Sequence, residues 1–444
     1  MKTITRRNAR GFLPALALSL LSAGGLAAAQ DNTPAAVSAD DTAASSSPMK
    51  SAPANPDQGH IYGTVLLDDD SEVTGTIRWG EQEANWIHHF NGDKAEPFDL
   101  SQLPDDDRER IEDSLPGPRF EFNGHVIELV RWLGSSDLQA QSFSVEFGQL
   151  SQLETLGGDR VRLTLRDGTT LEANGGSDDI GADIEVLGAS GQVQQIDWRD
   201  IEQVRFHAPE ATAPTFSPYL YGRVETRSGA FEGFVDWDRD ERYPEDELDG
   251  DVDGREQAVK FSTIRTITNQ GESSLVELVD GVTQSMSDTN DVNSENRGIV
   301  VHAAGLGRVL VPWSAFEKVS FFNAPDNLPR YAEFSDAGPI KARVSGAEGT
   351  AEGELMFDLD QGHEGEMLRG KDASGLQFEL PWQYIQRVTP QENNTATVTL
   401  RSGQVLELGK DPDVTGSNLG IAVVQKDRVQ YVPWEGLNGI EVQN

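Results

Sequence analysis

A short aromatic-led motif that occurs six times is the feature of this sequence that most constrains its fold. It reads aromatic, two residues, an aliphatic residue or Phe, two residues, aliphatic. Residues three apart eclipse one another in a 3₁₀ turn, so each copy predicts one such turn followed by a short strand. Recurrence of a motif is typical of chains built from repeated small modules. The six leading aromatic residues are Phe147, Trp198, Phe261, Trp313, Trp382 and Trp434.

Two kinds of strand pair alternate along the chain. The second strand of the first kind ends on an aromatic residue, as in residues 75–79 and 233–237, with Phe357 in place of tryptophan in the third copy. Because alternate residues of a strand share one face, we expect these aromatic residues to fill a core rather than bind a ligand. The second kind is a tight hairpin whose turn requires positive φ. Its turn glycines are Gly168, Gly281 and Gly403.

The alternation predicts three tandem units of about 110–120 residues, each made of two β-modules. The predicted units are residues 60–208, 218–322 and 330–444. Unit 1 contains an insertion at about residues 94–140. An acidic stretch near residues 101–114 predicts a short helix within it, ended by the prolines of residues 115–118.

A strand, a 3₁₀ turn and a final short strand also form the closing segment of SH3-like and Sm-like barrels. On these motifs the chain resembles bacterial secreted proteins built of tandem SH3-like barrels, over most of residues 60–442. The resemblance implies an all-β fold of about six small barrels in three pairs, with one mostly helical or irregular insertion. It implies no particular activity, since small barrels carry many unrelated functions.

Residues 1–30 have the organisation of a secretory signal peptide. Four basic residues precede the apolar stretch 12–26, and three alanines at 27–29 suit cleavage. A membrane anchor is the alternative, but Pro14 and the glycines at 24 and 25 interrupt the apolar stretch. Residues 31–59 have the composition of a disordered linker. No later segment is long and apolar enough to span a bilayer as a helix. We therefore expect a periplasmic or secreted protein.

The chain is strongly acidic, with 74 Asp and Glu against 36 Lys and Arg and a formal net charge of −38. A field of this sign repels nucleic acid and anionic lipid and attracts cations. A solvated acidic surface is the alternative explanation for the charge. The absence of cysteine from the sequence excludes disulfides, thiolate metal sites and a cysteine nucleophile.

The most specific local motif lies in residues 249–254, where acidic residues at positions 1, 3 and 5 precede a glycine at position 6. Calcium loops use this spacing to fold oxygen ligands around one cation. Position 12, a bidentate Glu in EF-hands, is Lys260 here, so the motif is not an EF-hand. The alternative is a solvated acidic loop. The predicted calcium ligands are Asp249, Asp251, Asp253 and Glu256.

Polar loops that share Asp-Val, Asn and Gly positions follow two of the tight hairpins, at residues 288–298 and 411–420. Asn and Asp side chains bond their own backbone in turns, so a structural role is the default. The alternative is a second cation site or a site for sugar hydroxyls. Its candidate residues are Asp291, Asn293, Asn296, Asp413 and Asn418.

Catalytic motifs are weak in this sequence. None of the seven histidines has zinc-ligand spacing. The polar stretch around His88 and His89 predicts a solvated or edge-strand pair rather than a ligand pair, and we expect His363 to be exposed. No nucleophile elbow or phosphate-binding glycine loop is present. We expect a non-catalytic interaction or scaffold module of the cell envelope, with an envelope protein or glycan as partner. The alternatives are a carbohydrate- or cell-wall-binding protein and, third, a hydrolase with paired carboxylates. Exposed tryptophans would favour carbohydrate, and the candidates are Trp79, Trp86, Trp132 and Trp237.

Overall fold

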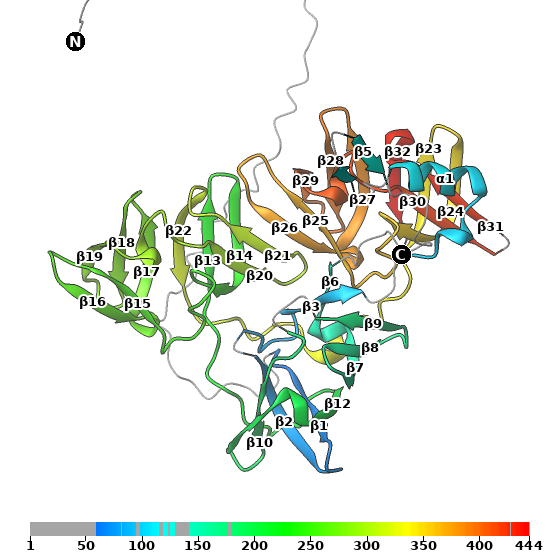
Figure 1. The fold of residues 1–444 in the computed structure, drawn as a ribbon. Coiled ribbons are helices and arrows are strands. Elements are labelled where there is room, and N and C mark those ends of the chain that lie inside the picture. The colour runs from blue at the N-terminus through cyan, green and yellow to red at the C-terminus, as the bar shows by residue number, and fades with distance from the viewer. Residues whose placement is uncertain are drawn as a thin grey trace, which may run out of the picture. The chain divides into compact units, whose positions relative to one another are not determined.

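The structure is a computed structural model that describes residues 59–80, 82–94, 98–114, 119–122, 125–128, 142–175, 179–426 and 428–443. The predicted signal segment 1–30 and the predicted linker, apart from Gly59, lie outside the described residues. Within the described part, no helix has the length and apolar character needed to cross a membrane. Antiparallel strands dominate this part, and its single α-helix is α1 (Asp105–Ser114) (Figure 1). The fold is therefore all-β.

Ten strands from β1 to β12 form one antiparallel sheet, called here the first set. Across the sheet their order is β6-β3-β9-β8-β7-β12-β1-β2-β10-β11. The insertion adds η1 (Leu100–Gln102), α1 and a separate hairpin, β4 (Arg119–Phe122) and β5 (His125–Glu128). The strands of the set are β1 (Tyr62–Leu67), β2 (Glu72–Trp79), β3 (His89–Lys94), β6 (Ser142–Glu146), β7 (Leu150–Gly157), β8 (Arg160–Leu165), β9 (Thr170–Asn174), β10 (Ile184–Gly188), β11 (Val193–Ile196) and β12 (Ile201–Phe206).

A second set of ten strands repeats this order strand for strand. Its pairings run β16-β15-β19-β18-β17-β22-β13-β14-β20-β21. Its strands are β13 (Tyr221–Thr226), β14 (Gly229–Asp236), β15 (Glu247–Asp251), β16 (Glu256–Lys260), β17 (Ile264–Asn269), β18 (Ser273–Leu278), β19 (Thr283–Ser287), β20 (Ile299–Ala303), β21 (Gly307–Val311) and β22 (Phe316–Phe321).

The third set has the same order again, β26-β25-β29-β28-β27-β32-β23-β24-β30-β31. Its strands are β23 (Lys341–Gly346), β24 (Gly349–Phe357), β25 (Met367–Lys371), β26 (Gln377–Pro381), β27 (Ile385–Gln391), β28 (Thr395–Leu400), β29 (Val405–Gly409), β30 (Ile421–Gln425), β31 (Arg428–Val432) and β32 (Leu437–Val442).

The sheets do not close on themselves, so the structure shows the all-β class but not the closed SH3-like barrels that the sequence predicted. The physical reason lies in the 3₁₀ turn. In the second set, η4 (Phe261–Thr263) connects β16 directly to β17, and the two strands are joined by the chain rather than by a ladder of hydrogen bonds.

The aromatic-led motif forms the predicted turns. Five of the six copies begin a 3₁₀ helix, and the sixth, at Trp313, begins a hydrogen-bonded turn. All six leading aromatic side chains are buried. Trp79, Trp237 and Phe357 are fully buried too, which confirms the prediction that these strand-ending aromatic residues fill a core. The five helices are η2 (Phe147–Gln149), η3 (Trp198–Asp200), η4, η7 (Trp382–Tyr384) and η9 (Trp434–Gly436); the others after the insertion are η5 (Asn290–Val292), η6 (Tyr331–Glu333) and η8 (Pro412–Val414).

The predicted tight hairpins also form, as β8–β9, β18–β19 and β28–β29, and their turn glycines have φ values of 87–91°. A second group of glycines, in the repeated aromatic-ended strands, has a different reason. A Cβ atom on Gly233 of β14 would lie 2.1 Å from the carbonyl oxygen of His302 on β20. The corresponding distances at Gly75 and Gly353 are 2.3 and 2.4 Å. Only glycine allows these strands to approach so closely.

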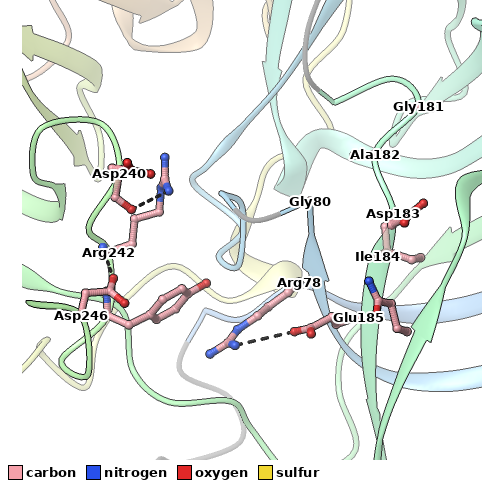
Figure 2. Close-up of a pocket in the computed structure, with 12 residues that line it drawn as sticks. Arg78, Gly80, Gly181, Ala182, Asp183, Ile184, Glu185, Asp240, Arg242 and Asp246 are labelled. Carbon is pink, nitrogen blue, oxygen red and sulfur yellow. Dashed lines mark hydrogen bonds and ion pairs between the residues drawn. The ribbon is translucent and has the colours of Figure 1, made fainter. Parts of the chain in front are cut away.

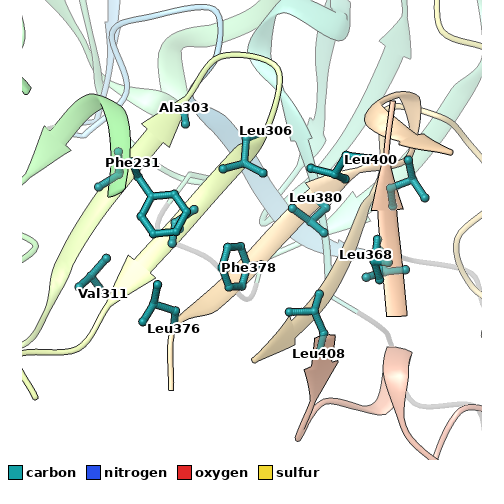
Figure 3. Close-up of a cluster of buried hydrophobic side chains, with 14 of the residues drawn as sticks. Phe231, Ala303, Leu306, Val311, Leu368, Leu376, Phe378, Leu380, Leu400 and Leu408 are labelled. Carbon is teal, nitrogen blue, oxygen red and sulfur yellow. The ribbon is translucent and has the colours of Figure 1, made fainter. Parts of the chain in front are cut away.

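One hydrophobic core runs through both the second and the third set, because β21 pairs with β26. Phe231 and Phe378 meet across this pairing with ring centroids 5.8 Å apart. Figure 3 shows Phe378 and Leu380 of β26 lying beside Leu306 and Phe231 of the second set. Edge strands are normally open to other chains, and here two of them stabilise each other.

The insertion of the first set packs on the third set. Leu103 and Ile111 are buried in one apolar cluster with Leu359, Ala422 and Tyr431. The first and third sets also meet in a polar contact, where the Lys94 ammonium forms ion pairs with Asp360 and Glu366. The sets are therefore packed together rather than joined only by the chain.

Candidate functional site

The predicted calcium ligands lie in an extended hairpin. Asp249 and Asp251 belong to β15, Glu256 begins β16, and Asp253 lies in the turn with a φ of 54°. Asp251 and Glu256 are direct cross-strand partners, so two like charges lie opposite each other. Asp249 lies two residues back along an extended strand, about 7 Å away. No group of three or more metal-ligating side chains is found within the described residues.

The predicted polar-loop residues bond their own loops. The side-chain oxygens of Asn296 and Asn418 accept hydrogen bonds from the backbone N–H groups of Gly298 and Gly420, at 2.9 and 2.8 Å. Asn293 accepts in the same way from the N–H of Glu295 at 2.8 Å. These are turn-forming bonds of the structural alternative.

Asp291 and Asp413, the acidic members of those loops, bond a neighbouring strand instead of their own loop. Both are buried, and each accepts a hydrogen bond from a backbone N–H on an equivalent strand, Asp249 of β15 at 2.8 Å and Arg369 of β25 at 2.7 Å. In the first set Asp179 accepts from the N–H of Asn91 at 2.7 Å. The three sets therefore hold one aspartate each at the same structural position.

A glutamate accompanies this aspartate in the first two sets. Glu83 and Glu241 each form a β-bridge with the tryptophan that precedes them by four residues. Burial raises the pKa of Glu83 well above its usual value, and the neighbouring Asp179 raises it further. Burial likewise raises the pKa of Glu241 to about 8, with Asp291 adding to the effect. Both glutamates therefore retain a proton far more readily than an exposed glutamate does.

The third set has Gln361 at the equivalent position, bridged to Phe357. The Gln361 amide donates a hydrogen bond to the Asp413 carboxylate at 2.9 Å. Its carbonyl oxygen accepts one from the indole N–H of Trp382 at 2.7 Å. An amide thus makes the bond that a protonated carboxyl group would make, because both present a donor beside a carbonyl acceptor.

Charged and histidine side chains from all three sets meet at a place that we call the junction. His88 and His89 are fully buried, which shows that the prediction of exposed side chains was wrong, and His363, elsewhere, is buried too. The reason is tertiary packing: the His88 ring contacts the rings of Tyr219 and His302, with centroids 4.7 and 4.4 Å apart. The members of the junction are His88, His89, Asp236, Arg242, His302, Arg308 and Glu379.

His88 and His89 are neutral in the junction. Burial lowers the pKa of His88 well below its usual value and that of His89 to about 4. The Nδ1 atom of His88 accepts a hydrogen bond from the N–H of Ala84 at 3.1 Å. The single proton of this neutral ring is therefore on Nε2, which has no hydrogen-bond partner.

Two ion pairs balance the charges of the junction. Arg308 Nη2 lies 2.6 Å from Glu379 Oε2, and His89 Nδ1 lies 3.3 Å from the same oxygen. Burial alone would raise the pKa of Glu379, but the charge of Arg308 holds it well below its usual value. In the second pair, Arg242 Nε lies 3.8 Å from Asp236 Oδ2, and the Tyr219 hydroxyl donates to Asp236 Oδ1 at 2.5 Å.

A cavity of about 290 Å³ opens at the junction. Its wall carries three guanidinium groups and three carboxyl groups together with His302. The arginines are Arg239, Arg242 and Arg308, and the acidic residues are Glu83, Asp236 and Glu379.

A larger pocket, of about 630 Å³, shares Arg242 with this cavity. Figure 2 shows Arg242 directed at Asp240 and Arg78 directed at Glu185, 3.7 Å away. The Arg78 guanidinium lies 4.2 Å from the ring centres of both Phe216 and Tyr243. Stacking and ion pairing hold this arginine in the pocket wall.

Sequence reasoning missed the junction because its members come from three distant parts of the chain. No motif connects Arg308 with Glu379, or His88 with His302. One signal was present: Glu83, Glu241 and Gln361 each follow the repeated aromatic residue by four positions.

No protein-family model matches the chain, and no curated protein matches it. Among solved structures, a streptogramin B lyase aligns over 81% of this chain and 99% of that chain, with 12% sequence identity and a TM-score of 0.11. A TM-score at that level carries no argument for a shared fold or function.

Proposed function

We propose that this protein is a non-catalytic, periplasmic or secreted interaction and scaffold protein of the cell envelope. The proposal rests on the contacts that the polar groups of the junction make with one another. Glu379 of the third set bonds both Arg308 of the second set and His89 of the first set. The buried polar groups best suited to catalysis therefore connect parts of the fold. The acidic exterior is then the surface that meets a partner.

The finer architecture belongs to the same proposal. We infer that the three sets are repeat units of one ancestral module pair, because their strand orders are identical. Each set contains two groups of five strands, and each group includes one aromatic-led turn. We infer that each group is the equivalent of one SH3-like barrel. Such modules present loops and edges to partners.

An envelope protein with a basic surface is the partner that the charge favours, because the chain carries a net charge of −38. The carbohydrate alternative needs exposed tryptophans, but Trp79, Trp86 and Trp237 are at most 1% exposed. The fourth candidate, Trp132, lies outside the described residues. Buried indole rings cannot stack on a sugar. A hydrolase stays the third candidate.

Site-specific photo-crosslinking in the producing bacterium tests the function. Val193, Val282 and Val405 are at least half exposed and accept a photoreactive residue without loss of packing. We expect discrete crosslinks to an envelope protein that weaken as ionic strength rises, since salt screens surface charge. Crosslinks to no protein, together with co-sedimentation with purified peptidoglycan, would favour the cell-wall alternative instead.

A structural calcium ion in the β15–β16 hairpin is a further part of the proposal. It rests on the like charges of Asp251 and Glu256, which a bound cation would neutralise. We expect the melting temperature of residues 31–444 to be higher in millimolar calcium than in EDTA, and magnesium to raise it less than calcium does. Changing Asp249, Asp251 and Asp253 together to asparagine should abolish the rise.

The turn between β1 and β2 provides a matched control for this calcium experiment. Asp68, Asp69 and Asp70 are exposed, and their change to asparagine removes the same charge from another tight turn. This control variant should keep the calcium response. Equal responses to calcium and magnesium, or equal losses in both variants, would show general charge screening and rule out the site.

A further inference from the structure

Two strand edges of the molecule have no partner strand. Within the described residues, β11 pairs only with β10, and β16 pairs only with β15. By their place in the strand order, β11 of the first set corresponds to β21 of the second, and β16 of the second set corresponds to β26 of the third. β21 and β26 pair with each other. The chain therefore carries a second, unpaired version of both edges of an interface that it already uses.

The other two strands of this kind are engaged elsewhere. Val145 of β6, the strand that corresponds to β16, forms a β-bridge with Glu366. Val429 and Tyr431 of β31, the strand that corresponds to β11, pack in the apolar cluster formed with the insertion. By contrast, the first three side chains of β11 and of β16 are exposed. β11 and β16 are thus the accessible edges.

The backbone of both edges is directed outward. Residues of an antiparallel strand alternate between those that bond the neighbouring strand and those that point away from it. Gly188 donates its N–H to the carbonyl oxygen of Gln192, so the next residue, Val193, points away from β10. The N–H of Asp249 bonds a side chain instead of β16, so its cross-strand partner Ala258 points away from β15. Both edges therefore offer backbone donors and acceptors to another strand.

The pairing of β21 with β26 supplies a register for these two edges. Arg308 and Val193 each lie five residues before the leading aromatic residue of their motif, and Glu379 and Ala258 each lie three residues before theirs. Arg308 is the partner of Glu379, so the same register places Val193 opposite Ala258. The three pairs in this register are Val193 with Ala258, Gln194 with Gln257, and Gln195 with Glu256.

The side chains of these pairs suit one another. Val193 is 51% exposed and gains an apolar neighbour in Ala258. The amides of Gln194 and Gln257 each provide donors and an acceptor for the other. In the last pair an amide donates to a carboxylate. No pair places like charges opposite each other, which would destabilise the contact.

We propose that β11 of one molecule pairs with β16 of a second copy of the chain, in the register of β21 with β26. The two strands do not pair within one molecule, so a second copy supplies the partner. Each molecule has one edge of each kind, and such a head-to-tail contact builds a ring or an open chain. Repulsion between chains of net charge −38 opposes the contact, so salt should strengthen it. The self-contact needs no envelope partner and is tested on the purified protein alone.

The middle pair decides how lasting the contact is. In the pairing of β21 with β26 this pair is Val309 and Phe378, at 0% and 2% exposure. Apolar side chains of this size keep such an edge covered permanently. Gln194 and Gln257 stand in their places and are exposed, so the two edges stay hydrated when the strands are apart. The contact between β11 and β16 is therefore reversible.

Disulfide crosslinking between two single-cysteine variants tests the contact, since the sequence has no cysteine of its own. Gln194→Cys is mixed with Gln257→Cys, whose Cα atoms lie about 4.5 Å apart in the proposed register, within reach of a disulfide. We expect mixed disulfide dimers to form at least about tenfold faster than between Gln194→Cys and a control, Val405→Cys, at a position that is 60% exposed. Equal rates would refute the contact, and so would an internal disulfide in a monomer that carries both changes.

Sedimentation velocity of residues 31–444 at about 1–300 µM measures the same association without a thiol. We expect the average mass to rise with protein concentration, and to rise more at about 0.5 M than at about 0.05 M NaCl. Ala258→Pro removes an N–H group that faces away from β15, so this variant should keep the wild-type melting temperature and stay monomeric. Ala258→Ser retains the N–H group and should associate as the wild type does. A wild type that is monomeric at every concentration, or equal association of Ala258→Pro, would overturn the proposal.

Discussion

Replacing Gly307 by alanine is expected to separate β21 from β26 and to destabilise the protein by about 2–5 kcal/mol. Two costs combine. Gly307 has a φ of 115°, and alanine in the left-handed region costs about 1–2 kcal/mol. In addition, a Cβ atom there would lie 2.1 Å from the carbonyl oxygen of Glu379, and such overlap costs about 1–3 kcal/mol.

Gly305 allows the two costs to be separated. It lies in the same turn with a φ of 74°, but a Cβ atom there would have no neighbour within 4 Å. Gly305→Ala should therefore show the backbone cost alone. Urea unfolding and differential scanning calorimetry measure both variants, and separate transitions in Gly307→Ala would show that the second and third sets have become uncoupled. Equal destabilisation by both variants would mean that β21 and β26 do not pair in solution.

The stability of the protein is expected to fall as the pH rises from about 5 to 8, and Glu241→Gln should make this fall smaller. Folding raises the pKa of Glu241 from 4.5 to about 8 because the side chain is half-buried beside Asp291. Between these values the folded state keeps a proton that the unfolded state releases, so each step up in pH favours unfolding. Above about 8 the loss is complete and the contribution becomes constant.

Gln361→Glu is the reciprocal experiment. The new carboxyl group would lie beside Asp413, whose pKa burial already raises to about 7. The stability of the Gln361→Glu variant should fall more steeply with rising pH than that of the wild type. The difference between the two proteins should be largest at pH 8. Melting temperatures at pH 5, 6, 7 and 8 measure all three proteins, with the exposed Glu256→Gln as the control for charge alone. If Glu241→Gln and Glu256→Gln change the pH profile equally, the buried pair is not the cause.

Local features of this fold were predictable from the sequence because neighbours in the chain determine them. The turn glycines, the 3₁₀ turns and the burial of the strand-ending aromatic residues Trp79, Trp237 and Phe357 depend on spacing within about ten residues, and all were predicted correctly. The acidic helix of the insertion also forms, as α1. Closed barrels were expected from resemblance alone, and they depend on edges whose partners no local pattern specifies.

The candidate site was not predictable because tertiary contacts override local polarity. His88 and His89 follow a polar stretch and read as exposed, but Tyr219 and His302 of the second set bury them. Similarly, the polar-loop motif identified Asp291 and Asp413 but not the partners Glu241 and Gln361, which arrive from another strand pair. A single sequence contains the residues of such a network without showing which of them meet.

The packing of the insertion on the third set imposes an order on the formation of the native protein. Leu103 and Ile111 are buried in a cluster that includes Ala422 and Tyr431, which lie close to the far end of the chain. A chain that emerges N-terminus first cannot complete this cluster until β30 and β31 have appeared. Until then the apolar side chains of Leu103 and Ile111 lack the partners that bury them. The acidic helix α1 therefore gains its one buried contact only when the C-terminal strands are in place.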